Sequence, residues 1–198
     1  MAKRKTAAAA TVKSPKPAEE TEQPILAPEQ VHALLGLPGP YEPPKPPPPW
    51  PGYLTFWDPG ISIRDVQKKH PALFCRTTAE WVDGQAFAKL TDSWKWRQLK
   101  LIAAEPGQPF DEQTKKLSKG DELPLSRELV AYLVIHALSA GERPDIPRLR
   151  CRDVMPSGRR VCIGPFRDSG LEIANVSDPW SSPGIGLASI FTPPVKRK

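Results

Sequence analysis

Proline is the residue type that most constrains how this chain can fold, because its prolines are crowded toward one end. The chain has 26 prolines in 198 residues, against a usual share of about 5%. Fourteen of them precede residue 60, and nine lie within 38–51. Each ring fixes φ and restricts the preceding residue, so residues 38–52 are predicted to form an extended polyproline II linker. Such a rod can bind an aromatic-lined groove of a protein partner or act as a stiff spacer, and we expect the spacer.

Composition divides the rest of the chain into segments. Residues 1–24 are poor in large apolar side chains and are expected to be a disordered basic tail. Residues 25–37 are predicted to hold a short amphipathic helix, which either docks on the body or orders when it meets a partner. Residues 53–192 contain five of the six tryptophans and are the predicted globular domain. Residues 193–198 form a basic C-terminal tail.

The formal net charge of +6 describes no single surface. Residues 1–17 carry five basic and no acidic side chains, and 196–198 carry three basic ones, so the other 178 residues hold 20 basic and 22 acidic side chains. The tail cluster of Lys3, Arg4 and Lys5 is a candidate nucleic-acid-binding site, since lysine and arginine bind phosphates without sequence preference. A solubilising, disordered terminus is the alternative.

Cysteine usage and hydropathy bear on location. Cys75, Cys151 and Cys162 are too few and too scattered for a disulfide framework, which favours a reducing, cytoplasmic compartment. No apolar run in the sequence approaches the roughly 18 residues of a membrane span, so we expect no membrane partner. The basic start precedes only a short, weakly apolar stretch, which is not typical of a secretory signal.

Hydrophobic patterning within 53–192 predicts helices and strands that segregate along the chain. The strongest element is a helix over 127–140, whose apolar residues cover about half of its circumference and which Gly141 ends. The other predicted elements are a helix capped by Ser62 and ended by Pro71, a strand at 72–78, a strand at 94–102, a helical turn at 111–117, and strands at 148–154, 159–166 and 171–176. The predicted fold class is α+β, a small, mostly antiparallel sheet packed on one central helix and preceded by a disordered proline-rich N-terminal region.

The strands at 148–154 and 159–166 flank a three-residue turn and are predicted to form a hairpin. The expected register pairs Arg152 with Cys162 and places Cys151 on the opposite face of the sheet. On the outer face this register gathers a candidate anion- or nucleic-acid-binding site, which consists of Arg148, Arg150, Arg152 and Arg160. A solvated face whose arginines pair with acidic residues elsewhere is the alternative.

The sequence carries no signature of a catalytic, metal or cofactor site. Its histidines and cysteines show no metal-ligand spacing, and it has no glycine-rich phosphate loop or nucleophile elbow. We therefore predict no catalytic residue, no metal and no cofactor. The remaining enzyme hypothesis uses His136 as a base or Cys162 as a thiol whose pKa neighbouring arginines lower. A hydrogen-bonded histidine at the edge of the core and an inert cysteine are the alternatives.

Several short strings within 94–190 form a pattern: Trp96-Arg97, Glu105-Pro106-Gly107, Phe110-Asp111-Glu112-Gln113, Gly141-Glu142-Arg143, Gly158-Arg159-Arg160-Val161-Cys162-Ile163-Gly164 and Gly186-Leu187-Ala188-Ser189. This pattern resembles a family of small, uncharacterised bacterial α+β proteins with no known activity. The chain departs from it at Pro144-Asp145 and after Trp180, and the proline-rich half is not covered. The resemblance implies a compact α+β domain and no particular chemistry.

These features favour a non-enzymatic binding or protein-interaction module of unknown ligand, with protein partners bound through the proline-rich segment. The first alternative is nucleic-acid binding through the basic tails and the hairpin arginines. The second is a small enzyme that uses His136 or Cys162.

Overall fold

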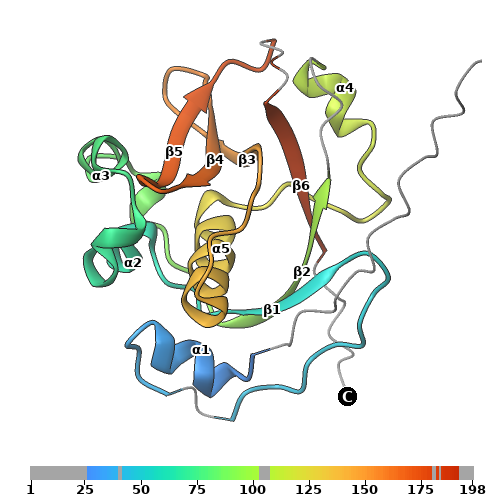
Figure 1. Cartoon of the computed structure of the whole chain (residues 1–198). Helices are drawn as coiled ribbons and strands as arrows, with labels where there is room; N and C mark the ends of the chain where they lie inside the picture. Colours follow the sequence, from blue (N-terminus) through green and yellow to red (C-terminus); the bar gives the residue numbers. More distant parts are fainter. Residues whose placement is uncertain (1–25, 40–41, 103–107, 180–181, 183, 192–198) are drawn as a thin grey trace, which may run out of the picture.

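One sheet and its covering helices make up the computed structural model, which describes residues 26–39, 42–102, 108–179, 182 and 184–191. These residues contain five α-helices, two short 3-10 helices and six strands (Figure 1). In chain order the elements are α1 (Pro28–Leu34), β1 (Leu54–Asp58), α2 (Ile63–Lys69), η1 (Pro71–Leu73), α3 (Arg76–Val82), η2 (Phe87–Lys89), β2 (Lys95–Ile102), α4 (Phe110–Thr114), α5 (Ser126–Ala140), β3 (Arg148–Val154), β4 (Arg160–Arg167), β5 (Gly170–Val176) and β6 (Ile185–Phe191). The predicted α+β class is confirmed.

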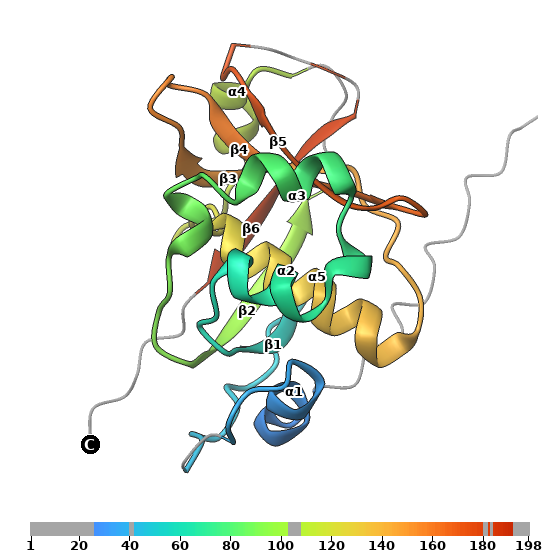
Figure 2. The ribbon, with the colours of Figure 1, turned by 90° about the vertical axis from the view of Figure 1, so that its left-hand side faces the viewer.

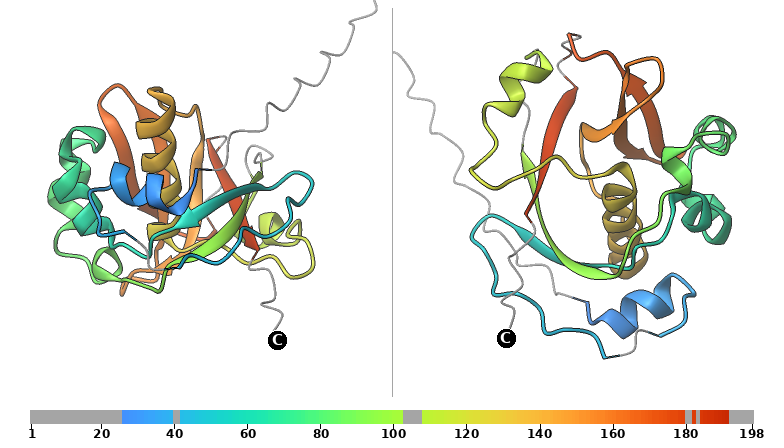
Figure 3. Two further views of the ribbon diagram at one scale, coloured as in Figure 1. Left: turned by 90° about the horizontal axis from the view of Figure 1, so that it is seen from below. Right: turned by 180° about the vertical axis from the view of Figure 1, so that it is seen from behind.

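The sheet has the strand order β1-β2-β6-β3-β4-β5. Every neighbouring pair is antiparallel except β3 and β6, which run parallel. The last strand in chain order, β6, therefore joins the β1–β2 half of the sheet to the β3–β5 half. The sheet curves around α5, which lies on its concave side (Figures 1 and 3).

The central helix α5 is the predicted one, and it begins one residue earlier than expected. Leu129, Leu133 and Val134 are fully buried, as a helix enclosed by a curved sheet requires. Gly141 ends the helix in the left-handed region, with φ of 72°. Two helices complete the enclosure, since α2 and α3 lie in front of α5 when the molecule is viewed from the side (Figure 2).

The convex face of the sheet, which we call the outer face, carries a second and smaller cluster of buried side chains. Cys162, Val176 and Ile185 form this cluster, separate from the main core around α5. Helix α4 covers it, and the side chain of Gln113 donates a hydrogen bond to the carbonyl oxygen of Ile185 at 2.8 Å. The helical turn expected at 111–117 therefore exists and has a defined place on the outer face.

The strand predicted at 72–78 is wrong. Pro71 begins the 3-10 turn η1, one isolated bridge joins Phe74 to Leu171, and α3 follows. The backbone N–H of Cys75 still donates to the carbonyl oxygen of Leu171 at 3.2 Å, and the hydroxyl of Thr78 accepts from the N–H of Ile173 at 3.1 Å. This segment thus closes the free edge of β5 with a helix end instead of another strand.

Sequence patterning missed the strands β1 and β6. Strand β1 is only five residues long, too short for a clear alternation. Strand β6 is buried on both faces from Ile185 to Ile190, so its residues do not alternate between apolar and polar.

Next to the turn the hairpin has the predicted register, with Val154 opposite Arg160, but farther from the turn the register differs from the predicted one by two residues. Arg150, not Arg152, lies opposite Cys162, because β3 is irregular between Arg150 and Val154. The irregular part of β3 pairs with the segment before α5, where the N–H of Arg152 donates to the carbonyl oxygen of Pro124 at 2.8 Å. A shift of two residues keeps every side chain on its face, so Cys151 and Cys162 still lie on opposite faces.

Candidate interaction surface

Residues 42–52, which we call the strap, lie along the outer face of β2 (Figures 1 and 3). Alternate residues of β2 point outward, and two of them bind the strap. The indole N–H of Trp96 donates to the carbonyl oxygen of Pro44 at 2.7 Å, and the side-chain amide of Gln98 donates to the carbonyl oxygen of Pro48 at 2.8 Å. Both donors are buried beneath the strap, with 8% and 1% of their surface exposed.

The strap ends in a turn that leads into β1. The N–H of Tyr53 donates to the carbonyl oxygen of Trp50 at 3.0 Å, and Gly52 takes a φ of 77°, which a side chain would disfavour. The ring of Trp50 packs against Phe191 of β6, with ring centroids 5.4 Å apart. The strap is therefore attached to the sheet at its middle and at its end.

The prediction that 38–52 is a spacer is wrong for the residues that the structure describes. A proline-rich segment has carbonyl acceptors but few N–H donors, so it can satisfy outward-pointing donors on a strand without forming a ladder. Trp96 and Gln98 supply those donors. The patterning of 94–102 did place both side chains on one side of the strand, but it could not reveal what covers them.

Most of the strap is nevertheless exposed. Pro44, Pro46, Pro48 and Pro49 face solvent, and only Pro43 and Pro47 are half-buried. Trp50 keeps 56% of its surface exposed. Large exposed aromatic side chains beside prolines are typical of binding surfaces.

The helix before the strap docks on the body, which decides between the two alternatives for 25–37. Val31 and Leu35 of this segment enter the main core. The indole N–H of Trp57 donates to Nε2 of His32 at 3.1 Å, and Nδ1 of His32 bonds to the carbonyl oxygen of Pro38. Because a carbonyl only accepts, this arrangement assigns the proton to Nδ1. Trp94, 42% exposed, lies next to the His32 ring, with centroids 5.5 Å apart.

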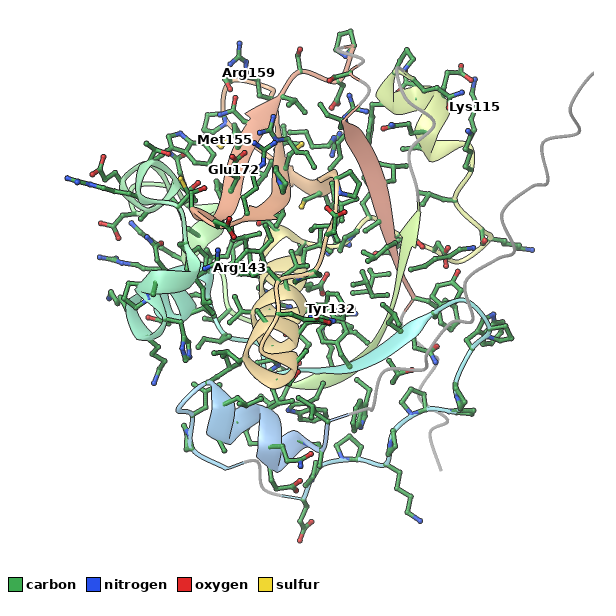
Figure 4. All side chains as sticks on the ribbon, in the orientation of Figure 1. Lys115, Tyr132, Arg143, Met155, Arg159 and Glu172 are labelled. Atoms are coloured by element: carbon green, nitrogen blue, oxygen red, sulfur yellow. The ribbon has the colours of Figure 1, made fainter. Side chains whose placement is uncertain are left out.

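The arginines of the candidate hairpin site are bound by other groups of the protein. Arg148 pairs with Glu172 at 2.7 Å, and Arg152 pairs with Glu122 at 2.7 Å. Arg160 donates to both carboxylate oxygens of Asp178 at 2.9 and 3.0 Å. Arg150 is fully buried and bonds to Gln113. The guanidinium of Arg160 also stacks on Phe110 of α4, 4.0 Å from the ring centroid. Figure 4 shows Glu172, the partner of Arg148, on the same part of the sheet as Met155 and Arg159. Helix α4 thus covers Arg150 and Arg160 through Gln113 and Phe110, whereas Arg148 stays half-buried and Arg152 exposed.

His136 lies within the core. It retains 8% exposure on α5, and its ring lies 6.1 Å from that of Tyr132, which points from α5 toward β1 and β2 (Figure 4). This placement favours the alternative of a histidine at the edge of the core over the hypothesis that His136 is a solvent-accessible catalytic base.

The expectation that arginines lower the pKa of Cys162 is wrong. Burial raises the pKa of this thiol to about 12 and outweighs the positive charges of Arg150, Arg148 and Arg160, which act in the opposite direction. Burial likewise raises the pKa of Cys151 well above its usual value. Both thiols are buried, and their raised pKa values favour the alternative of inert cysteines.

Sequence reasoning missed a buried ionic network between the start of α5 and the β1–β2 pair. It consists of Asp58, Asp92, Arg97, Arg127 and Glu128. Arg127 binds both carboxylate oxygens of Asp58 at 3.0 Å and Asp92 at 2.9 Å, and Arg97 pairs with Glu128. No local pattern reveals it, because Asp58 and Arg127 lie 69 residues apart in sequence.

The environment of the network shifts the pKa values of Glu128 and Asp92 in opposite directions. Burial raises the pKa of Glu128, although Arg97 and the N–H of Leu125 oppose this. Burial also raises the pKa of Asp92, but hydrogen bonds from Lys95 and Ser93 and the charges of Lys95 and Arg127 prevail and lower it to about 2. The network holds β1, β2 and α5 together, and we assign it a structural role.

Lys3, Arg4 and Lys5, like the 193–198 tail, lie outside the described residues. Among the residues that are described, no three His, Cys, Asp or Glu side chains are placed to hold a metal ion. No helix in that part of the chain is both long and apolar enough to cross a membrane.

No protein-family model, curated protein or solved structure matches the chain. The resemblance to small bacterial α+β proteins therefore stays a prediction.

Proposed function

We propose that the protein is a non-enzymatic protein-interaction module and that the strap is its binding surface. The observation that carries this proposal is the way in which the strap is held. Two side chains of β2 bind its backbone from beneath, while most of its prolines and Trp50 face outward.

This arrangement supports binding because it lowers the entropic cost of association. A free proline-rich peptide must be ordered when it binds, although its rings already restrict it. A segment fixed on a sheet has been ordered by folding. The fixed segment also places Trp50, a side chain type enriched at binding hot spots, at a defined position.

The test presents the immobilised full chain to an array of folded peptide-binding domains of three kinds, namely polyproline-binding, helix-binding and strand-adding domains. We expect at least one kind to bind, and Trp50→Ala to weaken that binding about tenfold or more, as for a hot-spot residue. Leu90→Ala is the matched control, since Leu90 is a comparably exposed apolar residue, 46%, outside the strap. Failure of all three kinds to bind, or equal binding by the two variants, would contradict the proposal.

A further inference from the structure

The proline-rich strap has one edge that is uniformly exposed. A polyproline II segment has three residues per turn, so residues three apart share an edge. Lys45, Pro48 and Pro51 are spaced in this way, and all three are exposed. Each of the other two edges contains one half-buried proline, Pro43 or Pro47. Among the three edges, this one alone has no half-buried residue, while the other two combine exposed and half-buried residues.

From this edge we infer the kind of partner: a protein domain with an aromatic-lined polyproline groove and an acidic pocket at one end of it. The inference rests on the proposed function and adds the chemistry of the partner. Pro48 and Pro51 would fill the spaces between the aromatic rings, and Lys45 would enter the acidic pocket.

The backbone of the strap leaves acceptors for such a groove. Within the described residues, the hydrogen bonds to strap carbonyls involve Pro44, Pro48 and Trp50. Successive carbonyls of a polyproline II segment point in three directions, so those of Pro46 and Pro49 are directed differently from the bonded carbonyls of Pro44 and Pro48. Donors in the partner's groove, such as an indole N–H, fit these acceptors as Trp96 fits Pro44.

Charge gives the partner its orientation. Lys45 is the single basic residue of the strap, and Glu42 is its single acidic one. No ion pair involves Lys45 in the part of the chain that the structure describes. A polyproline rod looks similar in both directions, so a cation at one end is what lets an acidic pocket distinguish them.

The experiment titrates the full chain with a purified SH3-type domain as the probe, because such a domain combines an aromatic-lined groove with an acidic pocket, and measures Kd by calorimetry. We expect Lys45→Glu to raise Kd about fivefold or more, the scale of one lost exposed ion pair. Lys89→Glu, which makes the same change at another exposed lysine, should leave Kd within about twofold.

The proline pair is tested by variants of equal composition. Pro48→Ala with Pro51→Ala should raise Kd about tenfold or more, whereas Pro46→Ala with Pro49→Ala, two exposed prolines of another edge, should change it far less. A probe whose acidic pocket is replaced by lysines should prefer the Lys45→Glu chain to the natural one. Thermal unfolding of each variant verifies that the fold is intact.

Absence of binding at about 1 mM probe, a Kd that both proline pairs change equally, or a Kd insensitive to Lys45→Glu would overturn the inference. None of these results contradicts the proposed function, which the array of peptide-binding domains tests separately. If a helix-binding or strand-adding domain binds there in a Trp50-dependent way, the proposed function holds and the polyproline edge does not.

Discussion

At the scale of single residues, the ionic network shows how much the core depends on charge balance. Asp58 has no exposed surface, and Arg127 retains 2%. Moving a charged side chain from water into the core costs several kcal/mol for each ion. The attraction between the two ions of a pair offsets about the same amount. A complete pair is therefore of modest net value, but a single remaining charge is expensive.

We expect Asp58→Ala to lower the free energy of unfolding by about 3–5 kcal/mol, because it leaves Arg127 buried with a reduced set of acidic partners. Urea unfolding measures the change. Glu80→Ala is the control, since Glu80 forms only an exposed pair with Arg76 at 3.2 Å and should cost less than about 1 kcal/mol. Equal losses for the two variants would mean that the network does not form.

At the scale of elements, α1 is the clearest case of stability supplied by tertiary contact. Seven residues are too few for a stable isolated helix. Its order comes from Val31 and Leu35 in the core and from the hydrogen bonds of His32 on either side. The helix also fixes the start of the proline-rich segment, so its docking determines where the strap begins.

Leu35→Ala should therefore lower the free energy of unfolding by about 2–5 kcal/mol, the range for a fully buried leucine. If α1 were detached in solution, the same change would cost no more than about 0.5 kcal/mol, as on an exposed surface. Chemical unfolding of Leu35→Ala and of the natural chain, followed by tryptophan fluorescence, distinguishes these two outcomes.

The elements that could be predicted are those with a long local pattern. Helix α5 has 15 residues and a terminal glycine, and β2 has eight residues with an imperfect two-residue pattern. Strand β6 could not be predicted, because burial on both faces removes the alternation. The binding of the strap to Trp96 and Gln98 could not be predicted either, since it joins residues 50 or more positions apart. Local sequence fixes which face a side chain occupies and leaves open what covers that face.

At the scale of the whole molecule, the positive charge is divided between paired arginines and the tails. Arg148, Arg152 and Arg160 each pair with a carboxylate. Forming a phosphate contact there would require breaking an existing ion pair. The nucleic-acid alternative then depends on the basic tails, to which Lys3, Arg4 and Lys5 belong.

For duplex DNA binding we expect a matched pair of triple variants to differ. Changing Lys3, Arg4 and Lys5 to Gln should make the slope of log affinity against log salt concentration less negative by about 3. This is close to one unit of slope for each lost phosphate contact. Changing Arg148, Arg152 and Arg160 to Gln removes the same charge and should leave the slope unchanged. Fluorescence anisotropy over a series of salt concentrations gives the slopes. A slope that depends on the hairpin triple, or no binding by the natural chain, would contradict this assignment.

The place of β6 in the sheet has a consequence for synthesis on the ribosome. Because β6 lies between β2 and β3, the sheet cannot close until residues 185–191 have been translated. Until then the nascent chain holds two incomplete sheets, and the ladder groups of β2 and β3 that β6 will pair are open to other chains. Folding of the sheet must therefore wait for residues 185–191, and a chain that stops before residue 185 would expose two strand edges where aggregation can begin.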